Sequence, residues 1–371
     1  MPDRSCAVDP MRFRSPSHGA VSSHAMTAIS EAPGWDAIDQ ALDQLYPGVE
    51  PQHLATMLKW RLGGPQPLDG ISIYPRDDHW HYVSYGMSEL YEKESSFVEQ
   101  SGWGFEFTIR VARSAGEQEA PMWAANLLQN LGRYVFTSSN AFGPGHYMTL
   151  NGPINLDQPD TAIRHVAFYI DPELGEIETP HGRLTFLQVV GMTDAEYEAA
   201  QSWSTARLLD AFRSELPLLV TDPARGSLLD NPQIAQIVAE GIARDGSSAS
   251  SSYVSQLDWS VDVAPTRLVL GALSAPKVAT ALRGRLPFGR PYVVFSDDRE
   301  LHFHAGEALN VDAGVEKELH VTVPNELVEP LLAALVDRAG IRAVSSDLTI
   351  EIVPTEIKND NGDVIEVIGG Q

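Results

Sequence analysis

The segment GWGFEFTIRVAR, residues 102–113, alternates apolar and polar side chains without a break from Phe105 to Val111. Residues two apart on a β-strand point to the same side of a sheet. The pattern therefore predicts a strand with two distinct faces. One face carries Phe105, Phe107, Ile109 and Val111, and the other carries Glu106, Thr108 and Arg110. The fold class then depends on which elements accompany this strand.

Further strands and several helices surround the segment. Strand-like runs bounded by Pro, Gly or Asp occur in ISIYP, HWHYVSY, HYMTLNGPI, RHVAFYID and GRLTFLQVVGM. Apolar residues at helical spacing predict helices in GWDAIDQALDQLYPG, QHLATMLKWRLGG, PMWAANLLQNLGRYVF, DAEYEAAQSWSTARLLDAFRS and NPQIAQIVAEGIARDG. The third of these helices is expected to run into a strand, and Thr193 or Asp194 is expected to cap the fourth. Together the elements predict an α+β fold, with mixed or antiparallel sheets packed against helices.

A Ser-rich segment, DGSSASSSYVSQ, predicts a linker between two domains. The length of 371 residues is enough for two domains, each with its own core. The expected organisation is a disordered N-terminal tail over residues 1–32, a large domain over 33–246, the linker over 247–260, a smaller α+β domain over 261–357 and a loose C-terminal tail over 358–371.

Charge and cysteine content narrow the classes of partner. The chain has 50 acidic and 26 basic side chains and a net charge of -24, which disfavours binding to nucleic acids and to anionic membranes. Its single cysteine, Cys6, excludes an intrachain disulfide and fits a cytoplasmic location. No apolar run has the length of a membrane span. The first residues lack the apolar centre of a signal peptide. Met26 is an alternative to Met1 as the first residue of the natural protein.

Two H-x-H pairs raise the question of a metal site. His79 and His81 flank Trp80, and His302 and His304 flank Phe303. Two imidazoles on one face of a strand can bind a metal, but a complete site needs a third and usually a fourth ligand. The nearest following carboxylates are poorly spaced to supply one. The alternative is that these are ordinary strand residues, and no cofactor is predicted. Known nucleophile and phosphate-binding motifs were not found either.

Seven blocks in order resemble the Suppressor of fused family. They are LYPG, KWRLGGPQPLDGISIY, HWHYVSYGMSELY, SGWGFEFTIRV, PMWAANLLQNLGRYVF, PHGRLTFLQVVGM and LLVTDPARGS. They cover about residues 35–246, the family's large N-terminal domain. LRGRLPFGRPYVVF, LHVTVPNELVEPLLAAL and DLTIEIVP resemble its smaller domain more faintly.

The resemblance implies a protein-binding adaptor that is not an enzyme. Animal members sequester Gli transcription factors by clasping a peptide between their two domains as an added strand. Tyr134, Phe142 and His146 fall in the segment that corresponds to the peptide groove, so they are the expected partner-binding residues. At the position of His146 the animal members have an acidic residue that binds a histidine of Gli. A histidine there loses the charge-assisted hydrogen bond, worth roughly 1.5–3 kcal/mol, and makes Gli-like recognition doubtful.

The acidic composition and the short linker resemble bacterial relatives, which are proposed as immunity proteins. We therefore expect a negative regulator that neutralises a protein or peptide partner, with a basic toxin as the leading candidate, because complementary charge speeds association. A metal-dependent enzyme that uses the H-x-H histidines is one alternative, and a structural component of a larger complex is another.

Overall fold

The computed structural model describes residues 31–262, 264–314, 317–358 and 362–370. The expected disordered tail, with Cys6 and Met26, lies outside these residues except for its last two positions. The chain forms two compact units. Unit 1 runs to Tyr197 and includes Phe212–Leu228, whereas unit 2 comprises Glu198–Ala211 and the residues from Leu229 onward. Among the described helices, none combines the length and apolar content needed to cross a membrane.

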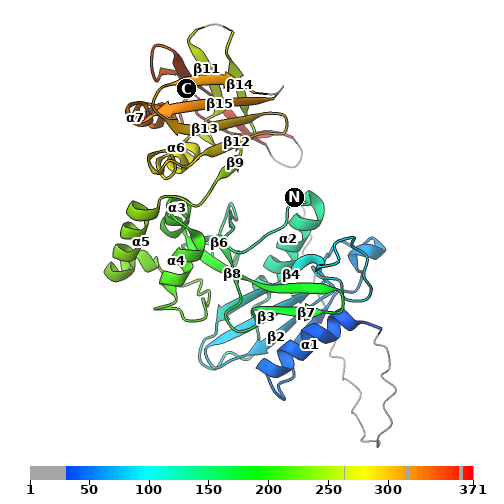
Figure 1. Ribbon diagram of the computed structural model, residues 1–371. Coiled ribbons are helices and arrows are strands. Elements are labelled where there is room, and N and C mark those ends of the chain that lie inside the picture. Colours follow the sequence, from blue (N-terminus) through cyan, green and yellow to red (C-terminus); the bar gives the residue numbers. More distant parts are fainter. Residues whose placement is uncertain (1–30, 263, 315–316, 359–361, 371) are drawn as a thin grey trace, which may run out of the picture. The chain divides into compact units, whose positions relative to one another are not determined.

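Unit 1 is built on a mixed sheet with the strand order β1-β2-β3-β4-β8-β6-β5, and β7 pairs with β8 beside this path. Its strands are β1 Gln52–Ala55, β2 Gly70–Pro75, β3 His79–Tyr85, β4 Gln100–Ala112, β5 Tyr147–Thr149, β6 Ile163–Ile170, β7 Glu176–Thr179 and β8 Gly182–Thr193. The neighbours β4 and β8 are parallel, and the other pairs are antiparallel. Strand β5 therefore lies at one edge of the described sheet, and Figure 1 labels β2, β3, β4 and β8 in its central part.

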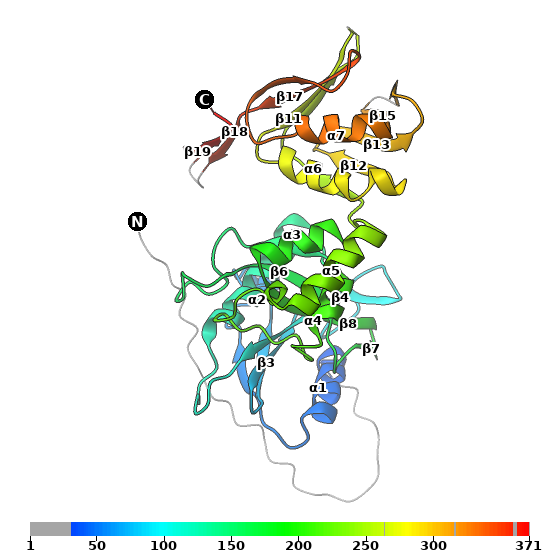
Figure 2. The ribbon, with the colours of Figure 1, turned by 90° about the vertical axis from the view of Figure 1, so that its left-hand side faces the viewer.

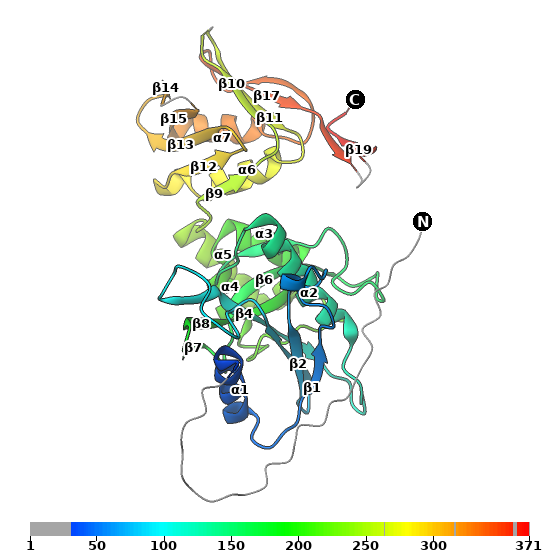
Figure 3. The same ribbon diagram turned by 90° about the vertical axis from the view of Figure 1, so that its right-hand side faces the viewer.

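Helices cover both faces of this sheet. α1 (Pro33–Leu45) and α2 (Met122–Ser138) lie on opposite sides of it, as Figure 2 and Figure 3 show. The predicted apolar face of β4 packs in the core beneath α2. On the other face, Ile38 and Leu42 of α1 pack with Val83 and Phe186. A strand covered on both sides is buried along most of its length, which explains why polar Glu106 and Arg110 are fully buried.

Unit 2 contains two larger sheets, ordered β10-β11-β17-β16 and β14-β15-β13-β12-β9, and the hairpin β18-β19. Its strands are β9 Ser251–Tyr253, β10 Leu257–Ser260, β11 Thr266–Gly271, β12 Tyr292–Phe295, β13 Glu300–Gly306, β14 Asn310–Ala313, β15 Glu318–Pro324, β16 Gly340–Ala343, β17 Leu348–Val353, β18 Thr355–Lys358 and β19 Val364–Ile368. Helices α6 (Ala275–Arg283) and α7 (Asn325–Ala334) lie side by side and share one core with both larger sheets (Figure 2). The predicted α+β class is confirmed.

The remaining helices are α3 Asp194–Ser202, α4 Thr205–Phe212 and α5 Pro232–Asp245, with short 3-10 helices η1 Trp60–Leu62, η2 Leu228–Asp230 and η3 Leu286–Phe288. Thr193 caps α3 as predicted: its hydroxyl accepts from the Glu196 N–H at 3.4 Å, and the Glu196 carboxylate accepts from the Thr193 N–H at 2.9 Å. Asn231 caps α5 by accepting from the Gln233 N–H.

Several sequence expectations are wrong in detail. The predicted helix in QHLATMLKWRLGG is strand β1 followed by η1, because β1 pairs with β2. α2 continues as a helix through RYVF, where a strand was expected. The single long helix expected after Thr193 is divided into α3 and α4, and Trp203 between them packs against Gly241 of α5.

The Ser-rich segment is not a free linker. Ser251–Tyr253 pairs with β12, and the fully buried Ser247 donates to the carbonyl of Gln201. Residues 364–368, expected in a loose tail, form β19 paired with β18. The compact units divide the chain at other residues than the expected domain limits, because Trp203 and Gln201 contact α5 and Ser247. The expected limits stay predictions of where independently folding domains end.

Candidate functional site

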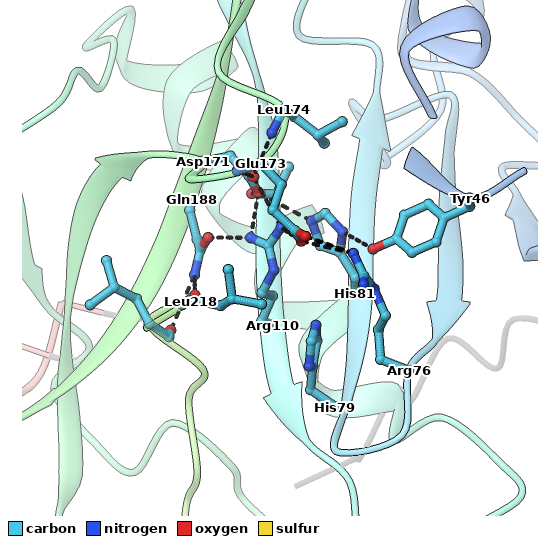
Figure 4. A network of polar contacts seen from close by, with 12 residues as sticks. Tyr46, Arg76, His79, His81, Arg110, Asp171, Glu173, Leu174, Gln188 and Leu218 are labelled. Carbon is cyan, nitrogen blue, oxygen red and sulfur yellow. Dashed lines mark hydrogen bonds and ion pairs between the residues drawn. The ribbon is translucent and has the colours of Figure 1, made fainter. Parts of the chain in front are cut away.

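His81 of the first H-x-H pair belongs to a buried polar network in unit 1 (Figure 4), whereas Nδ1 of His79 lies 2.7 Å from the carboxylate of Asp78. The hydroxyl of Tyr46 lies 2.6 Å from Nδ1 of His81, and a carboxylate oxygen of Asp171 lies 3.2 Å from its Nε2. Burial and the nearby Arg110 guanidinium lower the pKa of His81 to about 4. A neutral ring that donates Nε2–H to Asp171 and accepts from Tyr46 satisfies both contacts. Both nitrogens of His81 are thus engaged by the protein, which leaves none for a metal.

Asp171 and Arg110 form the centre of this network. Arg110 donates to both carboxylate oxygens of Asp171, at 2.6 and 3.0 Å, and also to Gln188. Thr108 and the backbone N–H groups of Glu173 and Leu174 donate to the same carboxylate, at 2.8, 2.9 and 3.0 Å. Burial alone would raise the pKa of Asp171, but its contacts with His81 and Arg110 hold it well below its usual range.

The network joins several elements of unit 1. Gln188 on β8 donates its amide to the carbonyls of Leu218 and Leu219, at 2.8 and 3.1 Å. Strands β3, β4 and β8 are thereby connected to the loop after β6 and to the segment after α4 (Figure 4). Because Arg110 and Asp171 are almost fully buried, we interpret this network as an internal element that fixes the strands, and not as a binding surface.

A pocket of about 640 Å³ opens on another part of unit 1. Its floor is aromatic: Trp60 and Trp103 both pack on Phe136 of α2, with ring centroids 5.7 and 5.8 Å apart. The loop between β3 and β4 supplies Phe97, whose side chain is 73% exposed. Four further exposed apolar side chains lie within three positions of a lining residue in the sequence, namely Met57, Leu58, Leu62 and Val98. Exposed apolar surface around a pocket is typical of an interaction site.

Carboxylates surround the aromatic floor. The pocket lining includes Asp69, Glu89, Glu92 and Glu94. Burial alone would raise the pKa of Glu89, but the Lys93 ammonium and three backbone N–H groups outweigh it and lower the pKa to about 2. Asp69 is paired with Lys59 at 2.7 Å. Because Glu89 and Asp69 are each paired with a lysine, the net negative charge of the lining comes from Glu92 and Glu94, and the pocket suits an apolar side chain beside a basic group.

Glu106 does not line this pocket, but it contacts Gly86 and Ser88, which do. Burial raises the pKa of Glu106 to about 7, and its oxygens accept from Ser84, Ser88 and the Gly86 N–H at 2.5–2.9 Å. A raised carboxyl pKa beside a cleft can indicate a general base. Glu106 is fully buried and its contacts are internal, so it does not reach a bound molecule.

The three residues expected to bind a partner lie together. The rings of Tyr134 and Phe142 stack with centroids 5.4 Å apart, and Phe142 stacks on the buried Phe168 at 4.1 Å. His146 accepts from the Gly143 N–H through Nδ1 at 3.2 Å, and its carbonyl accepts from the Phe168 N–H at 2.9 Å. Tyr134 is 37% exposed. Their assignment as partner-binding residues stays a prediction.

The second H-x-H pair has a partner that the sequence analysis missed. On the sheet of unit 2, His302 and His304 of β13 lie beside His320 of β15, and each of the three offers a ring nitrogen within 4.8 Å of the others. Burial and the neighbouring His320 and His302 lower the pKa of His304. A signal was present: RELH and KELH, residues 299–302 and 317–320, repeat the same four-residue pattern.

Comparison with known proteins places these features in a family. A family model described as Suppressor of fused protein matches residues 64–226. In a solved structure of the Sufu–Fu complex, a chain is 31% identical, and the alignment covers 98% of that chain and 56% of this one with a TM-score of 0.53. The chain belongs to the Suppressor of fused family.

Two further relatives define the extent of the likeness. The human Suppressor of fused homolog is 37% identical over 237 residues, which make up 58% of this chain and 49% of the human protein. This chain thus matches about half the length of its curated relatives. The crystal structure of Drosophila Suppressor of Fused, at 23% identity, has the same fold with a TM-score of 0.72 over 87% of this chain and 97% of that one. The family model includes the Tyr134–His146 segment and most of the pocket lining.

Proposed function

We propose that this member of the Suppressor of fused family is a non-catalytic regulator that acts by binding another protein. The observation that carries the proposal is the pocket of about 640 Å³ with its aromatic floor and exposed Phe97. A relative whose chain aligns with 56% of this one is found in a complex with Fu, which supports protein binding as the activity of this chain. Ser88 of the pocket lining donates to the fully buried Glu106, whose carboxylate also accepts from Ser84 and the Gly86 N–H, so we interpret this hydroxyl–carboxylate pair as a structural contact.

The partner that fits this surface is a basic protein with an apolar anchor side chain. The carboxylates around the pocket and the net charge of -24 would attract such a partner and raise its association rate. Aromatic side chains at the centre of an interface commonly contribute most of the binding energy. Neutralisation of a basic toxin, in an immunity role in the cytoplasm, is the specific form of this function that we favour. Clasping of a peptide between two domains stays a prediction of the family resemblance.

Two surfaces of unit 1 are candidates for the contact, and single substitutions distinguish them. Phe97→Asp adds a like charge to the acidic pocket at a side chain that is 73% exposed, so the fold should tolerate it. Tyr134→Ala removes the exposed end of the Tyr134–Phe142 stack. Leu156→Asp makes a comparable apolar-to-acidic change at a side chain that is 82% exposed and is not part of either surface.

The test is affinity capture by the wild-type chain and the three variants, followed by measured binding of the captured protein. We expect a basic partner that the wild type and Leu156→Asp retain equally. Phe97→Asp should weaken binding by ~2 kcal/mol or more, about thirtyfold, if Phe97 is a central contact. High salt should slow association. Equal binding by all three variants, or a captured partner that is acidic, would contradict the proposal.

A further inference from the structure

We propose that His302, His304 and His320 form a binding site for one divalent transition metal ion of the Zn²⁺ type. The site lies on one face of the β14-β15-β13-β12-β9 sheet in unit 2. It does not depend on the proposed protein-binding function, which rests on residues of unit 1.

The strand register brings the three rings together. β13 and β15 run parallel, and His302 lies directly opposite His320. His304 follows two positions after His302, so it points to the same face. The ring centroids of His302 and His320 are 4.6 Å apart, and those of His304 and His320 are 5.4 Å apart. Paired residues on adjacent strands cannot separate without loss of the sheet hydrogen bonds, so the backbone preorganises the cluster.

The separations of the nitrogen atoms suit a tetrahedral ion. With Zn–N bonds of 2.0–2.1 Å, two ligand nitrogens of a tetrahedral site are about 3.3 Å apart. Nε2 of His304 and Nδ1 of His320 are 3.2 Å apart. The ligand atoms of all three histidines lie within 4.8 Å of one another, and the side chains are partly exposed. Small ring rotations can therefore bring the third nitrogen to the separation that a tetrahedral ion requires.

Neighbouring carboxylates supply the outer contacts that such sites commonly have. Nε2 of His302 is 3.2 Å from the carboxylate of Glu300, and Nε2 of His320 is 3.6 Å from that of Glu318. A metal-bound histidine usually donates its other ring N–H to a carboxylate, which orients the ring and raises its basicity. In both histidines this arrangement leaves Nδ1 for the ion. The repeated E-L-H pattern therefore provides a ligand and its outer partner from each strand.

The chemistry of the donors selects the class of ion. Three imidazoles suit Zn²⁺, Cu²⁺ or Ni²⁺, whereas Mg²⁺ and Ca²⁺ require oxygen ligands. Three protein ligands leave a fourth tetrahedral position for water. The side chains of His302 and His320 are 21% and 34% exposed, so an ion can enter from solvent.

The experiment is calorimetric titration of the metal-free full-length chain with Zn²⁺, and with Mg²⁺ for comparison. We expect one Zn²⁺ per chain and no comparable binding of Mg²⁺. His320→Asn should weaken Zn²⁺ binding by at least about 100-fold, and Glu318→Gln by about 10-fold, the scale for loss of an outer partner. His53→Asn makes the same chemical change in unit 1, outside both candidate protein-binding surfaces, and should leave Zn²⁺ binding unchanged.

Other histidines of the chain could bind metal weakly, and the variants separate that case. Zn²⁺ binding of equal affinity in wild type and His320→Asn would overturn the proposal, as would the absence of stoichiometric binding in the wild type. The melting temperature of each variant without metal shows whether it is folded. If His320→Asn fails to fold, the comparison of Glu318→Gln with His53→Asn decides, and equal Zn²⁺ affinity of these two variants would refute the site.

Discussion

Asp171→Asn should destabilise unit 1 strongly. The carboxylate of Asp171 accepts from six donors, and each of its two oxygens accepts from Arg110. An asparagine NH₂ group placed at either oxygen position would face an Arg110 N–H and two further donors. Removing one partner of a buried ion pair costs about 3–5 kcal/mol. With a urea dependence of about 3 kcal/mol per M, the unfolding midpoint should fall by roughly 1–2 M.

Urea unfolding followed by tryptophan fluorescence measures this change, and Glu173→Gln is the matched control. Glu173 also receives a hydrogen bond from Arg110, at 2.8 Å, but its side chain is 23% exposed and can be solvated. We expect the control to lose about 1 kcal/mol or less. If Asp171→Asn lowers the midpoint no more than Glu173→Gln does, the buried network does not carry the stability assigned to it.

Two further predictions test local features of unit 1. The pKa of Glu106, about 7 in the folded chain and raised from 4.5 by burial, means that its stabilising contribution is present at low pH and is lost as the pH rises through 7. Denaturation at about pH 5 and pH 8 should therefore show a stability difference between wild type and Glu106→Gln that changes by about 2–3 kcal/mol, and a pH-independent difference would refute the raised pKa. Gly34→Ala should destabilise the docking of α1 by about 1–3 kcal/mol, because a Cβ would lie 2.0 Å from the carbonyl oxygen of Glu89. Gly152→Ala, where a Cβ meets nothing within 4 Å, should change the stability by less than about 0.5 kcal/mol, and equal effects of the two substitutions would contradict this account.

The periodicity of apolar residues was sufficient to predict the elements in which that pattern extends over many residues. β4 has the two faces that its alternation predicts, and α3 begins at its predicted cap, Thr193. It was insufficient where distant pairing decides the structure. Residues 52–55 are a strand because β2 lies beside them, and Ser251–Tyr253 is a strand because β12 does. Such pairing is a tertiary effect that a short window of sequence does not contain.

The candidate sites show the same division. The family resemblance located Tyr134, Phe142 and His146, and the structure brings them together through ring stacking and one tight turn. The aromatic pocket was not predicted, because the contact of Trp60 and Trp103 with Phe136 depends on how η1 and β4 pack onto α2. His320 was missed because its closeness to the H-x-H pair depends on the parallel pairing of β13 with β15.

The position of Arg110 has a consequence for how the sheet assembles. A shift of β4 by a single residue against its neighbours would turn Arg110 toward the face of the sheet that holds Phe107 and Ile109. Asp171 would then be left without its counterion. A misaligned sheet would thus contain an uncompensated charge among aromatic rings, at a penalty comparable to the whole stability of a domain. The Arg110–Asp171 pair therefore gives the native strand register a lower free energy than registers shifted by one residue.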